Sequence, residues 1–113
     1  MKIVDKQIFI DELKKIAEHG FGNLIKAVVD TEKNIIAIDG ELHSDEEALL
    51  LENGSKQQDL WGINLYPDIE GEDWIEFDSL INIRPLQKNK SRGIDNIEIK
   101  KKIIGIVNSL VKK

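Results

Sequence analysis

The sequence predicts an α+β fold: one antiparallel sheet of about five strands, with an N-terminal and a C-terminal helix packed on one of its faces. Apolar residues recur at helical spacing near both termini, and β-branched residues dominate the segments between them. Short polar turns join those segments, and the long crossovers that a parallel sheet needs are missing. At 113 residues, the chain is expected to form a single domain over residues 1–113.

The first helix is predicted over residues 10–19. Four apolar residues recur there at spacings of three and four: Ile10, Leu13, Ile16 and Ala17. This spacing places them on one face of a helix. Gly20 or Gly22 is expected to end it.

Four strands are predicted next, as two hairpins. Residues 24–30 and 34–42 are rich in β-branched side chains and flank the turn-like TEKN. Residues 47–52 and 56–66 flank Asn53-Gly54. Because Asn-Gly is the strongest short-range hairpin signal, the second turn is expected there.

A fifth strand is predicted over residues 74–84, WIEFDSLINIR. Alternation along a strand assigns one of its faces to the core. That face contains Ile75, Phe77, Ile81 and Ile83. Pro85 ends the strand because it has no N–H to donate.

The second helix is predicted to follow Asp95, which is expected to cap it. Its apolar stripe contains Ile99, Ile103, Val107, Leu110 and Val111. Gly105 lies within this helix and is interpreted as a position of close packing. We expect Ile99, Ile103 and Val107 to pack against the fifth strand.

Composition narrows the classes of function. The chain has no cysteine, which excludes disulfides, thiolate metal sites and thiol catalysis. Its formal net charge of −5 disfavours a nucleic-acid partner, since phosphate binding relies on a dense positive surface. No apolar run is long enough for a signal peptide or a membrane span, so a cytoplasmic protein is expected. No glycine-rich nucleotide loop occurs, and no cofactor is predicted.

The loop RPLQKNKSR is the main candidate binding site. The chain holds 14 lysines and only two arginines, Arg84 and Arg92, both in this loop. The planar fork of arginine binds phosphate or carboxylate in a way that lysine cannot imitate. Asn89 and Ser91 add amide and hydroxyl donors just before a helix start. We predict that these four residues bind a small anion. The alternative is that Arg84 pairs with an acid on its own strand and the loop is merely solvated.

The segment GELHSDEE suggests a second site. If the preceding strand continues through Asp45, then Glu41, His43 and Asp45 point to one side. A metal site usually has three or four ligands of constrained geometry, so no metal is predicted, and these residues are the candidates if one binds. His43 and Glu76 are candidates for proton transfer. The alternative for His43 is a local structural role.

Aromatic residues lie on the same predicted strands. Tyr66 shares a strand face with Asn64, and Trp61 and Trp74 lie near them in the predicted sheet. A groove with polar and aromatic walls is one interpretation. The other is that the tryptophans belong to the core, which is their more common place.

Three segments carry a resemblance to a known family: GELHSDEEALLLENGS, SKQQDLWGINLYP and DWIEFDSLINIRPLQKNKSRGI. They are similar to the short prokaryotic proteins grouped as domain of unknown function 5674, and the similarity runs nearly end to end. The resemblance implies a single-domain prokaryotic protein. It carries no activity, cofactor or catalytic residue to transfer.

Two functions from different classes are compatible with these patterns. The first is a small binding or interaction protein, with an anionic ligand or a protein as its partner. The second is an enzyme acting on a phosphorylated or other anionic substrate, which Arg84 and Arg92 bind while His43 or Glu76 transfers a proton. Convergence of His43 and Arg84 in one pocket would favour the enzyme. Homo-oligomerisation is a further expectation, because small sheets often cover their edges by pairing.

Overall fold

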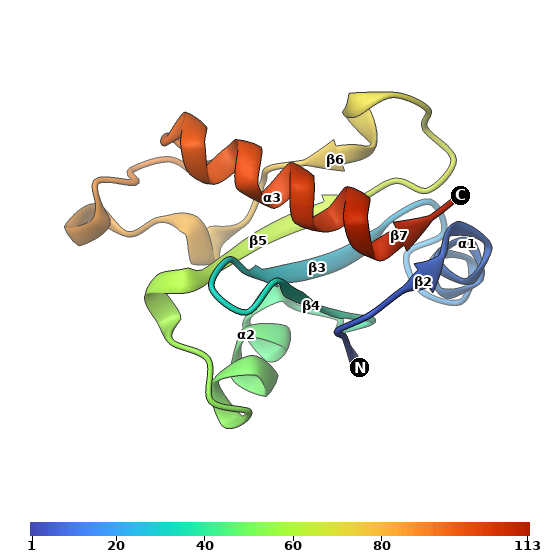
Figure 1. The fold of residues 1–113 in the computed structure, drawn as a ribbon, viewed down its shortest axis with the longest axis horizontal. Helices are drawn as coiled ribbons and strands as arrows, with labels where there is room; N and C mark the ends of the chain where they lie inside the picture. The colour runs from blue at the N-terminus through green and yellow to red at the C-terminus, as the bar shows by residue number, and fades with distance from the viewer.

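The computed structural model describes residues 1–113 and contains three α-helices and seven strands. Five strands form an antiparallel sheet in the order β1-β4-β3-β5-β6 (Figure 1). Their bounds are β1 (Lys2–Val4), β3 (Ile25–Asp30), β4 (Ile35–Ile38), β5 (Leu60–Leu65) and β6 (Ile75–Glu76). The α+β class and the five-stranded antiparallel sheet are as predicted. The sheet is not single, because β2 (Ile8–Phe9) and β7 (Val111–Lys112) form a separate parallel pair.

One face of the large sheet carries the main hydrophobic core, a cluster of 20 buried residues. In Figure 1, α3 (Ile97–Leu110) crosses this sheet, while α1 (Ile10–His19) lies beside one end of it. The cluster draws on both of these helices and on alternate positions of the strands: Leu13, Ala17, Ile25, Ala27, Val29, Ile36, Ile38, Trp61, Ile63, Leu65, Trp74, Ile75, Ile103 and Val107. Trp61 and Trp74 therefore belong to the core.

The opposite face is covered by a third helix, α2 (His43–Glu52), which the sequence analysis missed. Its apolar cluster is much smaller, with four buried residues: Val28, Ala37, Leu50 and Leu60. The predicted arrangement, with helices on one face of the sheet only, therefore omits the layer that α2 forms on the other face.

The hairpin predicted around Asn53-Gly54 is wrong, because α2 occupies its first strand. EEALLLE consists of strong helix formers, and the Asn-Gly pair ends the helix instead of turning a hairpin. Gly54 has a φ of 93°, and its N–H donates to the Leu51 carbonyl at 3.1 Å. Helical periodicity was hidden because two of the three side chains that α2 buries are polar, namely His43 and Glu46, with Leu50 as the third.

The continuous strand predicted over 74–84 is also wrong. Pairing with β5 stops after Glu76, and Leu80–Asn82 forms a 3₁₀ turn. Asn82 then replaces a strand neighbour, since its side chain bonds both the N–H and the C=O of Gly62, at 2.8 and 2.9 Å. Ile75 is buried as expected, but Ile81 packs against the α2 cluster and Ile83 is 42% exposed.

The C-terminal helix is present, with Ile103 and Val107 buried. It begins at Ile97, and its cap is Asn96 rather than Asp95. A side chain at Gly105 would meet no atom within 4 Å, so this glycine is not a close-packing position.

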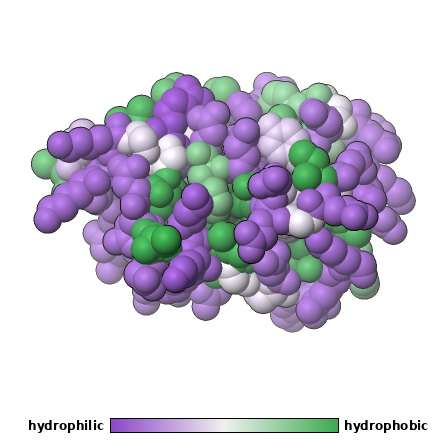
Figure 2. Space-filling model, turned by 90° about the horizontal axis from the view of Figure 1, so that it is seen from above, coloured by the Kyte–Doolittle hydropathy of each residue, from purple (hydrophilic) through white to green (hydrophobic).

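The surface seen in Figure 2 is mostly hydrophilic, with separate hydrophobic patches between the polar side chains. The three helices are too short and too polar for any of them to cross a membrane.

Candidate functional site

The helix α2 presses two titratable side chains against the sheet. His43, its first residue, is 9% exposed, and its Nε2 lies 2.8 Å from the Ile63 carbonyl oxygen. A carbonyl only accepts, so Nε2 carries the proton and donates it to Ile63. Burial lowers the pKa of His43 from its ordinary value of 6.5, and the bond to Ile63 opposes this in part. The imidazole is therefore neutral at pH 7.

Glu46 lies one turn further along α2 and is fully buried. Its Oε2 accepts a hydrogen bond from the Gly40 N–H at 3.0 Å, while Oε1 has no partner. Burial raises the pKa of Glu46 to about 9, so the side chain is a neutral carboxylic acid at pH 7. A Cβ on Gly40 would lie 2.6 Å from the Glu46 side chain, which requires glycine there.

Beside His43, polar side chains cross the same face of the sheet. Strand pairing sets Lys26 opposite Asn64 and Asn64 opposite Glu76, on three neighbouring strands. Asp78 is close enough for its charge to act on both His43 and Tyr66: it opposes the lowering of the His43 pKa and adds to the raised pKa of Tyr66. We call this group the polar strip: Lys26, His43, Asn64, Tyr66, Glu76 and Asp78.

Asn64 is the centre of the polar strip. Its Nδ2 donates to Glu76 Oε1 at 2.9 Å and to the Asp78 carbonyl at 3.2 Å. Both partners are acceptors, which fixes the orientation of the amide. Oδ1 then faces away from both acceptors. It is buried and has no hydrogen-bond partner, in a residue that is only 8% exposed. Tyr66 also bonds to Glu76, since its hydroxyl donates to the same Oε1 at 3.1 Å.

The structure brings the two proton-transfer candidates into one strip, with Asn64 beside His43 and bonded to Glu76. It does not bring Arg84 to them. The guanidinium of Arg84 donates at 2.5 Å to the carbonyls of Gln57 and Leu60, and it stacks 4.1 Å from the ring centre of Trp61. None of the three main pockets is lined by His43 or Arg84.

Arg84 also does not pair with an acid of its own predicted strand. Burial lowers the pKa of Arg84. The charge of Glu47 in α2 opposes this shift in part. Nε of Arg84 is buried without a partner. Its other two nitrogens tie the loop to the start of β5, so the geometry of this arginine is that of a structural clamp.

Each of the other three residues of the predicted anion loop makes at least one side-chain hydrogen bond within the protein. Asn89 is 2% exposed, and its Nδ2 donates to the carbonyls of Asn82 and Gly93 at 2.7 and 2.8 Å. Ser91 donates to Asp95 at 2.7 Å, and Arg92 donates to Asp78 at 2.6 Å. An anion at this loop would therefore compete with two carboxylates for its donors.

The predicted metal candidates are not arranged as ligands. The strand ends at Ile38, so Glu41, His43 and Asp45 do not alternate along it, and the last two lie in the first turn of α2. His43 already uses Nε2 for the Ile63 carbonyl. No group of three or more histidine, aspartate or glutamate side chains has the geometry to hold a metal ion.

A pocket of about 590 Å³ lies next to the polar strip. We call it the α1 pocket, because the end of α1 and the residues that follow it form one wall. Residues 39–42 form the opposite wall, and Lys26 belongs to both the pocket and the strip. Apolar side chains supply nearly half of its lining: Ile16, Phe21, Leu24, Ile25 and Leu42.

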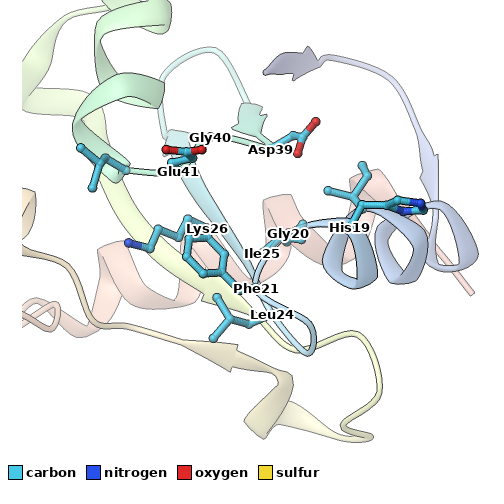
Figure 3. A pocket seen from close by; sticks show the side chains of 11 residues that line it. His19, Gly20, Phe21, Leu24, Ile25, Lys26, Asp39, Gly40 and Glu41 are labelled. Carbon is cyan, nitrogen blue, oxygen red and sulfur yellow. The ribbon is translucent and has the colours of Figure 1, made fainter.

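The charged groups of the α1 pocket are free of ion pairs. Figure 3 shows the carboxylates of Asp39 and Glu41 on one wall and the Phe21 ring across from them. The three ion pairs of the structure involve neither these acids nor Lys26. Lys26 instead holds its ammonium 5.1 Å from the centre of the Phe21 ring.

Sequence reasoning missed Lys26 and Phe21 as site residues, and it named Asn64 only as part of a groove with Tyr66. The available signal for Lys26 and Asn64 was a single polar residue within an apolar run, as in LIKAVV and GINLY. For Phe21, the signal was an aromatic residue between two glycines, where no regular element can bury it.

Comparison with known proteins gives a family and no function. The family described as "Protein of unknown function (DUF5674)" matches residues 2–110. No curated protein and no solved structure matches the chain.

Proposed function

We propose that this chain, which belongs to the DUF5674 family of proteins of unknown function, is a binding protein whose ligand enters the α1 pocket. The observation that carries the proposal is the combination found there. A hollow of about 590 Å³ has a partly apolar lining and charged groups that make no ion pair. Sites for small molecules usually combine an apolar lining with a few polar groups that fix orientation.

Several contacts favour binding over catalysis. A general base must reach the proton that it removes, directly or through a water. His43 is buried, donates through Nε2 to the Ile63 carbonyl, and is not part of the pocket wall. The guanidinium of Arg84 is bonded to the carbonyls of Gln57 and Leu60, outside the α1 pocket. The groups that an enzyme would combine are therefore kept apart.

The experiment is a fragment screen followed by amide chemical shifts in ¹⁵N-labelled protein. We expect saturable shifts at Phe21, Lys26 and Glu41. Leu42→Trp places a large ring at the pocket wall and should abolish them. Leu51→Trp is the matched control, because it makes the same change at an exposed leucine at the other end of α2. If no fragment shifts the pocket amides, or if Leu42→Trp binds as the parent does, the proposal is wrong.

A second candidate is the enzyme acting on an anionic substrate, and one observation favours it. The polar strip joins His43 to Glu76 through Asn64, and Arg92 contacts the strip at Asp78. Thermal-shift measurements with phosphorylated metabolites and short oligonucleotides test it. Stabilisation that is lost in Arg92→Lys, which keeps the charge but not the fork, would support this candidate. An equal response of parent and variant would remove it.

A further inference from the structure

We propose that the α1 pocket recognises a primary alkylammonium group, that is, a cationic head on an apolar chain. This inference rests on the proposed binding function and adds the chemical class of the ligand. It is opposite in sign to the anion that the sequence suggested for the other end of the molecule.

The head group is assigned from the two walls of the pocket. Asp39 and Glu41 present carboxylates from one side, and neither has a cationic partner in the protein. Phe21 lies on the other side with half of its side chain exposed. A cation between a carboxylate and an aromatic face is attracted by both. For an anion, the donor side chains in the lining are Lys26 and His19.

Lys26 gives evidence both for and against a cationic head group at the Phe21 ring. Its ammonium already lies 5.1 Å from the centre of the Phe21 ring, so this ring accepts an alkylammonium in the folded protein. Lys26 and the imidazole of His19 are the lining side chains that can donate to a carboxylate ligand. In Figure 3 the ammonium of Lys26 extends to one end of the pocket, away from His19. Two carboxylates against one ammonium give the pocket a negative balance, and the net charge of −5 steers cations toward the protein.

The apolar chain is assigned from the apolar part of the lining. Ile16, Leu24 and Ile25 belong to the α1 wall, together with Phe21. Each methylene that is buried there should tighten binding by roughly threefold to fourfold. Hexylammonium should therefore bind more tightly than butylammonium, by a factor that a charge contact alone does not produce.

The test is calorimetric titration at low salt with three six-carbon probes that differ only in the head group: hexylammonium, hexanol and hexanoate. We expect hexylammonium to bind most tightly. Glu41→Gln and Asp39→Asn should each weaken it by about twofold to fivefold, the range of exposed charge contacts. Glu52→Gln removes the same charge from the far end of α2 and should leave binding unchanged.

The variants are chosen to keep the fold. Asp39 has a φ of 66°, a left-handed conformation that asparagine also adopts readily, so Asp39→Asn keeps the backbone preference. Circular dichroism of each variant confirms that it is folded before titration.

The outcomes separate the ligand class from the binding function. If hexanol or hexanoate binds as tightly as hexylammonium, or if the acid variants bind as the parent does, the alkylammonium assignment is overturned. If the probe that binds the parent no longer binds Leu42→Trp, the α1 pocket is still supported as the binding site. If no six-carbon probe and no fragment binds, both proposals fall together.

Discussion

The two faces of the sheet are built by different means. The face that carries α3 is filled with apolar side chains, 20 of them in one cluster. The face under α2 has an apolar cluster of four, and polar side chains such as His43, Glu46, Asn64 and Asn82 fill much of the rest. The first face is specified by burial, which tolerates many apolar residues. The second is specified by hydrogen bonds, each of which needs a particular partner.

The largest expected effect is on the apolar face. Ile103→Ala removes a fully buried side chain between α3 and the sheet. We expect a loss of about 2–5 kcal/mol in the free energy of unfolding, from lost burial and the cavity that remains. Urea denaturation measures it.

Ile83→Ala is the matched control for this change. Ile83 is 42% exposed, so the same substitution should cost less than about 0.5 kcal/mol. Equal losses in the two variants would contradict the assignment of the two positions.

The second effect concerns the buried acid under α2 and depends on pH. Glu46 has a pKa of about 9 in the folded protein against an ordinary value of 4.5, so burial favours the protonated form. Below pH 4.5 Glu46 is protonated in both the folded and the unfolded state, so its contribution to stability is fully present. Above it the unfolded chain ionises first, and stability falls by up to about 1.4 kcal/mol per pH unit until the folded pKa is reached.

Glu46→Gln replaces the titrating carboxyl group with an amide and so tests this pH dependence. Its unfolding free energy should be close to that of the parent near pH 4.5 and should exceed it increasingly toward pH 8. Denaturation of parent and variant at several pH values gives the difference. A difference that does not change with pH would mean that Glu46 is ionised in the folded protein.

A third, smaller effect sharpens the comparison. Asn82→Leu keeps a similar volume but removes both hydrogen bonds to the buried backbone of Gly62. We expect a loss of about 1–3 kcal/mol, since a buried polar group left without a partner is costly. A variant as stable as the parent would show that apolar filling is sufficient on this face too.

The smallest effect is a gain. Gly105→Ala lies on the exposed side of α3, and its new methyl group meets nothing within 4 Å. Because glycine is a poor helix former, alanine should stabilise the protein by about 0.5–1 kcal/mol. A rise in the thermal midpoint checks it, and a fall would mean that the glycine is packed after all.

The apolar face is also the part of the fold that could be predicted from sequence. Both terminal helices and the strands β3, β4 and β5 follow apolar periodicity, which burial imposes directly. The helix α2 was missed because it buries His43 and Glu46 where a helix pattern expects apolar residues. The segment after Glu76 was missed because Asn82 replaces a strand by side-chain bonds, which leave no periodic trace.

The candidate site divides in the same way. The sequence identified His43 and Glu76, which the structure does bring into one strip. It named Asn64 as part of a groove with Tyr66 but did not place it between these two residues. It favoured Arg84 for its rarity, whereas the structure uses its planar fork to clamp two carbonyls. Rarity of a residue type indicates that its shape is needed, and only the fold shows whether the need is for a ligand or for the chain itself.

The parallel pairing of β2 with β7 has a consequence for folding kinetics. It joins Ile8 to Val111 and Phe9 to Lys112, so nearly the whole chain lies in the loop that these contacts close (Figure 1). Closing so long a loop costs more entropy than any local contact, so we expect this pair to form after the main sheet has assembled. Two residues on each side form its ladder, and Ile8 and Val111 also pack into the main core. We expect so short a ladder to open before the central sheet in native-state hydrogen exchange. Residues 8–9 and 111–112 would then open as one unit, while the central sheet, which includes β1, stays closed.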